Sequence, residues 1–352
     1  MWLDDIRRLR RGSAGAEAPW PPRHLSLALQ GGGYFGAFTW GVLDRLLEEE
    51  DIEFDAVSGA SAGAVNAVLL AAGLVEGSRQ AARQKLRGFW HRMSKAASFV
   101  PFGGGSAFAG LTPGASTLSF WTRLVSPYQF NPFDLNPLRT ALNEEIDFER
   151  LREFSPVRLM ISATRVSDGR ARIFENHEIS AETVLASSCL PLLHHAVTVE
   201  DETYWDGGYA ANPPLIPLVA ETVAPDILIV QLTPMKASIT PTTSRGISGR
   251  LDQINFNSSL LTELEALSRF TDLCRSLLGV HPSNGRKQRR LRIHRVAAEE
   301  EFEGLAEASA IDLNWAFLTK LRDSGRAAAD AWLHRNESVP RPMALEWEAR
   351  SY

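Results

Sequence analysis

Two strand–turn–helix units follow one another near the N-terminus, and they restrict the fold more than any other feature. Residues 25–30 form a short apolar run that ends at Gly31, Gly32 and Gly33, and an amphipathic helical pattern follows. Residues 52–58 form a second apolar run, which leads through the pentapeptide GASAG into a segment rich in alanine and leucine. Strands that alternate with helices in this way predict an α/β domain with a parallel sheet.

The length and composition are those of a globular protein. The 352 residues are enough for one large domain or two ordinary ones. Hydrophobic residues make up 44% and charged residues 22%, which excludes a disordered, collagen-like or coiled-coil chain. The net charge of -5 lacks the basic excess of proteins that hold nucleic acid, so we expect no such partner. The two cysteines, Cys189 and Cys274, are too few for a disulfide framework or a cysteine-based zinc site.

The sequence has no apolar stretch of the roughly 18 residues that a membrane span needs. Residues 1–23 carry charges without an apolar core after them, so we expect a flexible leader rather than a secretory signal. The few cysteines fit a reducing compartment. We therefore expect a cytoplasmic protein, and any contact with a membrane is expected to be peripheral.

The rest of the chain continues the same alternation and then becomes mostly helical. The later predicted strands lie at 157–165, 171–175, 197–200 and 227–232. The later predicted helices lie at 182–188, 254–278 and 313–333. A basic run at 286–292, before a strand-like segment, and an acidic run at 299–301 are each expected to form a solvated face. This pattern predicts one domain at 24–240, with a mainly helical C-terminal extension at 241–352 packed on it.

The pentapeptide Gly59-Ala60-Ser61-Ala62-Gly63 matches the G-x-S-x-G pattern of a nucleophile elbow. In that motif the serine lies on a sharp turn between a strand and a helix, and the glycines let neighbouring backbone approach closely. The N-terminus of the following helix favours negative charge that develops beside the hydroxyl. Glycine, alanine and serine are common residues, so an ordinary tight turn explains the five residues equally well.

The glycine cluster has two interpretations. Gly31, Gly33 and Gly36 satisfy the G-x-G-x-x-G pattern of a dinucleotide-binding turn, and Asp55 lies near the distance expected of a ribose-binding acid. A dinucleotide-binding oxidoreductase is therefore an alternative, although the second strand ends in Ser58 and leads directly into the elbow. The same backbone N–H groups also suit an oxyanion that forms at an ester carbonyl, where one donor typically lowers the barrier by about 3 kcal/mol.

The third motif is Asp206-Gly207-Gly208, within the segment TYWDGGYAANPP. An aspartate that follows a strand and precedes two glycines places its carboxylate in a cleft with little steric obstruction. Asp-Gly is also a strong turn signal, and a plain turn is the simpler interpretation of these three residues alone.

Together, the glycine-rich loop, the serine elbow and Asp-Gly-Gly resemble the patatin-like phospholipase family. The flanking segments LALQGGG, GVLDRL, VSGASAGAVNA, ASSCLP and YWDGGYAANPP are also similar to that family. The resemblance covers residues 25–234. It implies a three-layer α/β/α sandwich with a mostly parallel central sheet, and hydrolysis of acyl esters of lipids without a metal or other cofactor. A lipid ester is then the expected partner, and the oligomeric state is left open.

The resemblance also implies a Ser–Asp dyad instead of a Ser-His-Asp triad. By position, Ser61 would be the nucleophile and Asp206 the general base. Gly32 and Gly33, with the N–H of Tyr34, would form the oxyanion hole. An aspartate at its reference pKa of about 3.9 is a poor base for a hydroxyl, so we expect partial burial to raise the pKa of Asp206.

One residue departs from the family pattern. The glycine loop of the family usually carries Arg or Lys where this sequence has Phe35. Phe35 supplies no cation near an oxyanion, and we expect it to extend an apolar acyl pocket instead. A non-catalytic lipid-binding member is thus a further alternative. The intact Ser61 and Asp206 argue against it, because a site that has lost its catalytic activity has no chemical need for both residues.

Two remaining features lie near the motifs. His194 and His195 precede the Asp-Gly-Gly segment and hint at a Ser–His pair, but a loop or packed histidine is the simpler interpretation. The other histidines show no metal-ligand spacing. The phenylalanine-rich stretch at 99–133 is the best candidate for a lid or an interfacial surface, and packing against the sheet explains some of it equally well.

Overall fold

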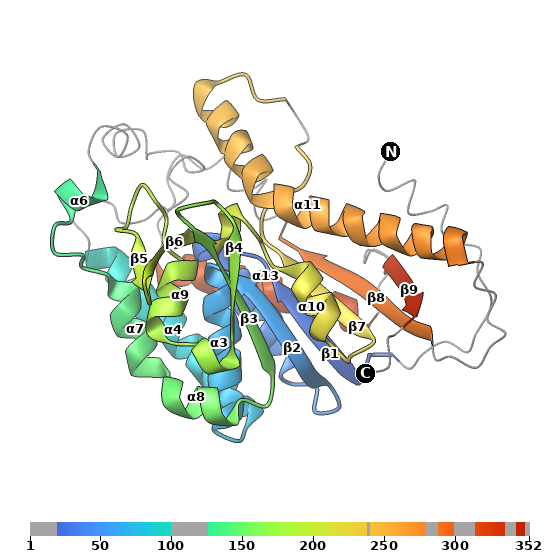
Figure 1. The fold of residues 1–352 in the computed structure, drawn as a ribbon. Helices are drawn as coiled ribbons and strands as arrows, with labels where there is room; N and C mark the ends of the chain where they lie inside the picture. Colours follow the sequence, from blue (N-terminus) through green and yellow to red (C-terminus); the bar gives the residue numbers. More distant parts are fainter. Residues whose placement is uncertain are drawn as a thin grey trace.

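A sheet of nine strands forms the centre of the part of the chain that the structure describes (Figure 1). The structure is a computed structural model, and it describes residues 20–99, 126–237, 240–278, 288–298, 314–334 and 343–348. The strands are β1 (His24–Leu29), β2 (Glu53–Ala60), β3 (Arg158–Arg165), β4 (Ala171–Glu175), β5 (Val197–Val199), β6 (Glu202–Asp206), β7 (Asp226–Gln231), β8 (Gln288–Ala297) and β9 (Met343–Glu348). Their order is β5-β6-β3-β2-β1-β7-β8-β9, and β4 also pairs with β3.

The centre of the sheet is parallel and its margins are antiparallel. β3, β2, β1, β7 and β8 are parallel neighbours. β4 and β6 pair antiparallel with β3, β5 with β6, and β9 with β8. The predicted parallel α/β sheet is therefore confirmed, and the four later strands predicted from the sequence are each correct to within one residue at either end.

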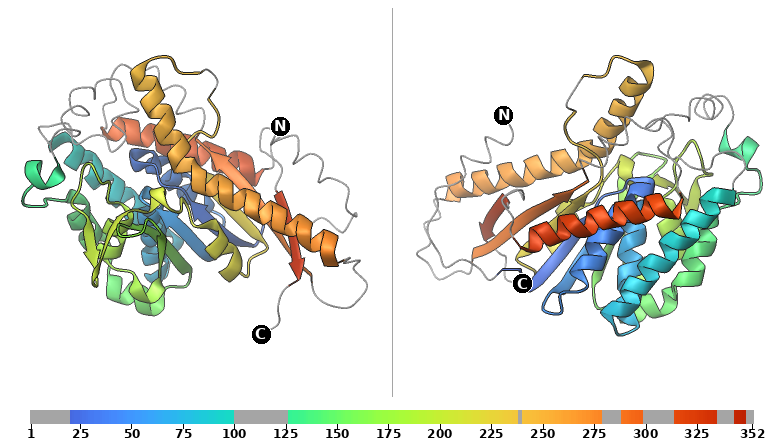
Figure 2. Two further views of the ribbon diagram at one scale, coloured as in Figure 1. Left: turned by 45° about the horizontal axis from the view of Figure 1, so that its top comes forward. Right: turned by 180° about the vertical axis from the view of Figure 1, so that it is seen from behind.

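Helices cover both faces of this sheet. They are α2 (Gly36–Leu46), α3 (Ala62–Val75), α4 (Arg79–Phe99), α6 (Pro127–Phe130), α7 (Pro137–Glu145), α8 (Phe148–Phe154), α9 (Ala181–Ser187), α10 (Leu215–Glu221), α11 (Ser244–Leu278) and α13 (Trp315–Leu333). Figure 1 shows α10 and α11 in front of the sheet, and the view from behind in Figure 2 shows α4 and α13 on the opposite side. Within the described ranges, none of the helices combines the length and apolar character that crossing a membrane requires.

Alternating side chains on the strands build two separate cores. Leu27 and Leu29 of β1 belong to the larger core, which they share with side chains of α2, α3, α4 and α13. Ala28, between them, belongs to a smaller core with Ile227 and Ile229 of β7 and with side chains of α10 and α11. Successive side chains of a strand point to opposite faces, so one strand serves both cores. The result is the predicted three-layer α/β/α sandwich.

The C-terminal segment takes part in the central sheet. Its predicted helices are present as α11 and α13, but the segment also supplies β8 and β9, which the expected mainly helical extension did not include. β8 pairs with β7 along six residues, and Leu291 and Ile293 of β8 are buried in the smaller core. The segment 241–352 therefore completes the sheet as well as covering it.

Part of the basic run at 286–292 lies within the sheet and not on a solvated face. Arg292 donates two hydrogen bonds to the carboxylate of Asp226, at 2.7 and 2.6 Å, and Nε2 of His294 lies 2.7 Å from the same carboxylate. Burial alone would raise the pKa of Asp226, but the hydrogen bonds from His294 and Arg292 lower it below its usual value. The acidic run at 299–301 lies outside the described residues.

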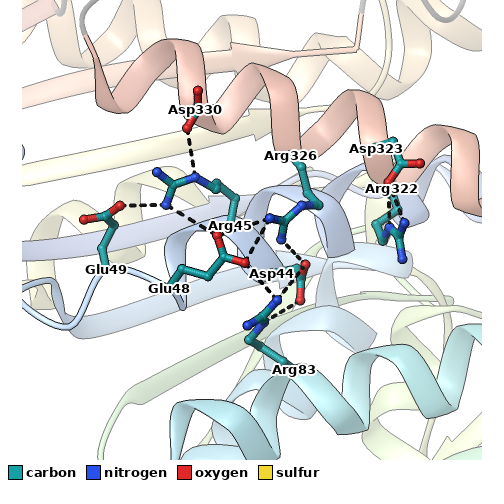
Figure 3. A network of polar contacts seen from close by, with 9 residues as sticks. All are labelled: Asp44, Arg45, Glu48, Glu49, Arg83, Arg322, Asp323, Arg326 and Asp330. Atoms are coloured by element: carbon teal, nitrogen blue, oxygen red, sulfur yellow. Dashed lines mark hydrogen bonds and ion pairs between the residues drawn. The ribbon is translucent and has the colours of Figure 1, made fainter.

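α13 crosses α2 at two glycines that let the backbones approach closely. A Cβ on Gly41 would lie 1.9 Å from the carbonyl oxygen of Arg322, and one on Gly325 would lie 2.0 Å from that of Phe38. Figure 3 shows the ion pairs that surround this crossing and join α2 to α4 and α13. They link acidic side chains of α2, of the turn after it and of α13 to arginines: Asp44 with Arg83 and Arg326, Glu48 with Arg83 and Arg326, and Arg45 with Glu49 and Asp330.

The end of the predicted leader belongs to the packed structure. The indole of Trp20 packs edge-on against Trp332, with ring centroids 4.9 Å apart, and its Nε1 donates a hydrogen bond of 2.6 Å to the carbonyl of Leu333. The leader was expected to be flexible as far as residue 23, and its Trp20 is packed against α13 in the structure. Residues 1–19 lie outside the described residues.

Candidate active site

Ser61 lies alone between the end of β2 and the start of α3, as the elbow motif requires. Its backbone angles, φ 53° and ψ −124°, fall in a region that side-chain-bearing residues rarely adopt and that is often strained at functional sites. A Cβ on Gly63 would lie 2.0 Å from the carbonyl oxygen of Leu29, so only glycine allows the helix to start this close to β1. The serine side chain is 7% exposed.

The glycine-rich loop follows β1 and runs directly against the elbow. A Cβ on Gly31 would lie 2.8 Å from Cβ of Ser61, and one on Gly36 would lie 2.7 Å from Cβ of Ala62. Gly33 has φ 56°, which favours glycine. Within the described part of the chain, the N–H groups of Gly32 and Gly33 donate no hydrogen bond. These two backbone donors near Ser61 thus have no hydrogen-bond partner among the described residues.

Asn66, on α3, fixes the glycine-rich loop to the elbow. Its Nδ2 donates to the carbonyl oxygens of Gly36 at 3.0 Å and Ala62 at 2.9 Å, and its Oδ1 accepts from the indole of Trp90 at 3.1 Å. All of these groups are buried, so the hydrogen bonds hold the start of α2 at a set distance from the start of α3.

Asp206 is the last residue of β6, and two glycines follow it in a single turn of 3-10 helix, η3 (Gly207–Tyr209). A Cβ on Gly207 would lie 2.1 Å from the carbonyl oxygen of Ser162, so the chain turns tightly against β3. The Asp206 side chain is completely buried, and its Oδ1 accepts a hydrogen bond of 2.7 Å from the N–H of Gly208.

The side chains of Ser61 and Asp206, which the family resemblance pairs as a dyad, are neighbours in the structure. Oδ2 of Asp206 has no hydrogen-bond partner among the described residues. Burial raises the pKa of Asp206 to about 7, while the nearby Ser61 hydroxyl and the N–H of Gly208 oppose this shift. The two side chains are therefore neighbours, although the pair falls short of the geometry of a formed hydrogen bond. Such contacts often tighten only when substrate binds.

Three polar residues at the site were not singled out from the sequence. Oγ of Ser187 accepts a hydrogen bond of 2.9 Å from the N–H of Ser61. Oδ1 of Asn212 accepts one of 2.7 Å from the N–H of Gly31, and Gln30 is buried directly before the loop. Each lies inside a segment that resembles the family, and their polar side chains beside the motifs were the available signal.

Phe35 is 7% exposed and belongs to the larger hydrophobic core. Its N–H donates to the carbonyl of Gly32 at 3.2 Å, which helps to close the turn after the glycines. Tyr34 is partly buried, and burial raises the pKa of its hydroxyl. Whether Phe35 borders an acyl pocket stays a prediction.

The two histidines before Asp206 join loops to one another. Nε2 of His195 lies 3.1 Å from the carbonyl oxygen of Pro127, and its ring stacks on Tyr128 with centroids 4.1 Å apart. Nδ1 of His194 accepts from the N–H of Leu190 at 3.3 Å, and burial lowers the pKa of His194. These contacts agree with packed loop histidines. Most of the phenylalanine-rich stretch, at 100–125, lies outside the described residues, and Phe133 at its end is 84% exposed.

Asp55 lies at the wrong end of its strand for a ribose-binding acid. It is near the start of β2, whereas the glycine-rich loop follows the end of the parallel strand β1. Its Oδ2 accepts hydrogen bonds from the Thr222 hydroxyl at 2.8 Å and from the N–H groups of Val223 and Ala224 at 2.6 and 3.2 Å. The structure therefore contradicts the role that the dinucleotide interpretation gave to Asp55.

Comparison with known protein families identifies this arrangement. Residues 27–219, more than half of the chain, match the family model described as patatin-like phospholipase. The chain belongs to the patatin-like phospholipase family. The patatin-like match contains the glycine-rich loop, the elbow and Asp206, and it ends before β7 and α11. Membership of this family implies lipid hydrolase activity.

Solved structures of other proteins match this chain at low sequence identity. VipD from Legionella pneumophila is 16% identical with a TM-score of 0.44, and the match covers 94% of this chain and 69% of VipD. The type III effector ExoU is 15% identical with a TM-score of 0.35, over 94% of this chain and 56% of ExoU. In the ExoU–SpcU complex of Pseudomonas aeruginosa the matched chain is 19% identical, with a TM-score of 0.31 over 70% and 52% of the two chains. A comparison with curated protein sequences gave no match.

Other reactive groups in the described residues do not form a competing site. Burial raises the pKa of Cys189 to about 12, so its thiol stays protonated at neutral pH and is a weak nucleophile. Among the same residues, no group of three or more His, Cys, Asp or Glu side chains is arranged to hold a metal ion.

Proposed function

We propose that this protein is a serine acyl hydrolase that cleaves carboxylic esters of lipids through an acyl-enzyme on Ser61. The observation that carries the proposal is the buried carboxylate of Asp206, whose unpartnered Oδ2 lies beside the Ser61 hydroxyl. A serine hydroxyl is a weak nucleophile until an adjacent base takes its proton. Family membership supports the lipid substrate class.

In the first step, Oγ of Ser61 attacks the ester carbonyl carbon and its proton moves to Oδ2 of Asp206. The carbonyl oxygen becomes an oxyanion, which the N–H groups of Gly32 and Gly33 stabilise, with that of Tyr34 as a third donor. When the tetrahedral intermediate collapses, the bond to the alcohol breaks and the alcohol leaves with the proton from Asp206. Water then attacks the acyl-serine by the same route and releases the fatty acid. These steps need no cofactor.

The environment of Asp206 suits this role. A general base is most efficient when its pKa lies near the working pH. Burial raises the pKa of Asp206 to about 7, so a large fraction is ionised at neutral pH and the carboxylate is more basic than an exposed aspartate. No histidine is required to accept the proton.

Contact with a lipid surface is part of the proposal. Phe133 is 84% and Leu135 is 73% exposed, both in the segment after α6. α6, which precedes these residues, contacts the loop before β5 through the stacking of Tyr128 on His195 and the hydrogen bond from Ala196 N–H to the Tyr128 hydroxyl. Exposed apolar side chains near the site support peripheral binding, which flotation with phosphatidylcholine vesicles would measure.

Covalent labelling tests the function directly. A fluorophosphonate should react with the wild-type protein, and mass spectrometry should locate the adduct on Ser61. S61A should abolish both the adduct and hydrolysis of a p-nitrophenyl ester. S258A is a matched control, because Ser258 is exposed on α11 and only its own helix uses the hydroxyl. An adduct on another residue, or full ester hydrolysis by S61A, would overturn the proposal.

A further inference from the structure

Gln30 directly precedes the three glycines, and its side-chain amide is buried among hydrogen-bond partners. Its Oε1 accepts from the N–H groups of Leu232 at 2.7 Å and Thr233 at 2.8 Å, just beyond β7. Its Nε2 donates to Oδ1 of Asn257, on α11, at 2.9 Å. The start of the glycine-rich loop is therefore held between the end of β7 and a helix from the C-terminal segment.

Asn257 is itself fixed in orientation. It is 2% exposed, and its Nδ2 donates to the carbonyl oxygens of Pro234 at 2.8 Å and Thr233 at 3.3 Å. Since carbonyl oxygens only accept hydrogen bonds, the amide nitrogen has to face them, and Oδ1 then points to Gln30. Rotating this buried amide would leave polar groups unpaired, which costs about 1–3 kcal/mol for each group.

A second connection joins α11 to the same loop. The N–H of Gly31 donates to Asn212, whose Nδ2 donates to the carbonyl of Phe256 at 3.0 Å and whose N–H donates to Oγ of Ser259 at 3.0 Å. The ring of Phe256 also lies against Gly208, where an added Cβ would be 2.6 Å from the ring. α11 thus touches both the turn that carries Asp206 and the glycine-rich loop. That loop would supply the oxyanion hole and is called the oxyanion loop below.

The oxyanion loop needs support of this kind. Three adjacent glycines supply backbone donors, but they have no side chains that could restrict their own conformation. Donors lower the barrier only when they already point to the position of the oxyanion. A displacement of about 1 Å can cost on the order of 100-fold in rate. The order of the loop must therefore come from the residues that hold its ends.

We propose that Asn257 is a positioning residue for the oxyanion loop and acts through its hydrogen bond to Gln30. The inference rests on the proposed function, because an oxyanion hole is needed only if Ser61 attacks a carbonyl. It assigns to α11, which lies beyond the family match at 27–219, a part in the reaction. Asn257 itself touches no reacting atom.

The variant N257A tests this role. It removes the partner of Gln30 and should lower kcat for a p-nitrophenyl ester about 10- to 100-fold, with KM changed less than about threefold. The rate of fluorophosphonate labelling should fall in parallel, since that reagent also uses the oxyanion donors. The pH midpoint of the reaction should not move, because the surroundings of Asp206 are unchanged.

Two further variants separate positioning from general loss of stability. L264A removes a buried side chain from the smaller core on the same helix, and we expect a loss of stability at least as large with kcat within about twofold. In N257D, a carboxyl oxygen still accepts the hydrogen bond from Gln30. Burial favours the protonated carboxyl group, whose O–H can replace the amide N–H that donates to the carbonyl of Pro234. We therefore expect N257D to retain more of the wild-type kcat than N257A, even if N257A folds poorly.

Each outcome decides the inference. A selective loss of kcat in N257A, partial recovery in N257D and normal kcat in L264A would support it. If N257A turns over like the wild type, or if L264A loses as much kcat, the inference is wrong while the proposed function stands. If the wild type neither hydrolyses esters nor labels at Ser61, both fail.

Discussion

Asp206 ends β6 and Ser61 directly follows β2, and these two strands lie on either side of β3. Asp206 pairs with Ala163 on one side of β3, and Ala60, the neighbour of Ser61, pairs with Ser162 on the other. The two groups are fixed by a sheet and not by flexible loops. The backbones of the two residues should therefore move little between the free and the substrate-bound protein, and any tightening of the contact should come from the side chains.

The pH dependence of ester hydrolysis should follow the ionisation of Asp206. Its pKa is raised to about 7, and the base is active only when ionised. We expect kcat/KM to rise with pH, to reach half of its plateau near pH 7, and to stay level above it. The rate should be followed at the isosbestic wavelength of p-nitrophenol. H195Q is the control and should keep the same midpoint; a profile that is flat from about pH 5 to pH 8 would contradict this assignment.

The same pKa predicts how stability depends on pH. The pKa of Asp206 is about 7 in the folded protein and 3.8 as the reference, so the folded state binds more protons between these values. The stability of the wild type should then fall as pH rises through this window. D206N lacks the buried charge and should be more stable than the wild type above pH 7, by at most about 4 kcal/mol.

Urea unfolding of both proteins at several pH values measures this difference. The advantage of D206N should shrink as pH falls toward about 4, where Asp206 is protonated in the folded state and begins to be protonated in the unfolded state. Equal stability of D206N and the wild type at about pH 8 would show that the carboxylate is better solvated than its burial indicates.

The backbone of Ser61 predicts an unusual order of stabilities. S61A keeps a Cβ at φ 53°, whereas S61G removes it. Since strain of this kind costs about 1–3 kcal/mol and glycine loses up to about 1 kcal/mol through chain entropy, S61G should be more stable than S61A by about 1 kcal/mol. Ser258, within α11, offers the matched pair. There S258G should be less stable than S258A, because glycine is unfavourable inside a helix. The same order at both positions would argue against strain at Ser61.

The crossing of α2 and α13 allows close contact and ion pairing to be compared. G325A should be destabilising by about 1–3 kcal/mol or more, because its Cβ would lie 2.0 Å from the backbone oxygen of Phe38. R326A removes ion pairs to Asp44 and Glu48, whose partly exposed charges typically contribute about 1 kcal/mol or less for each pair. Chemical denaturation of both variants measures the order, and a larger loss in R326A would show that the network outweighs the packing.

The sequence predicts most of the site because its motifs are local. Gly31 to Gly36 and Gly59 to Gly63 each lie within one turn between a strand and a helix, so their spacing predicts the turns, while the role of each turn followed from the family resemblance. The approach of Asp206 to Ser61 followed from the family resemblance, since no local pattern joins residues so far apart. The hydrogen bond between Gln30 and Asn257 had no such signal, because it depends on where α11 packs.

The errors have the same origin. Asp55 has the right spacing for a ribose-binding acid, but it lies near the start of β2, and the glycine-rich loop lies at the opposite end of the parallel strands. The basic run at 286–292 was expected to form a solvated face, but Arg292 donates two hydrogen bonds to the buried carboxylate of Asp226 on the neighbouring strand. Both outcomes depend on how the strands are arranged in the sheet, and a single sequence does not record that arrangement.

The parallel pairing of β8 with β7 has a practical consequence for recombinant work. A fragment that stops near the end of the matched family segment would leave the hydrogen-bonding groups of β7, or of β1 beside it, uncovered along one side. An exposed edge strand can pair with strands of other chains, so such a fragment should self-associate and precipitate. Expression boundaries should therefore extend beyond β9, even though the motifs of the reaction end long before it.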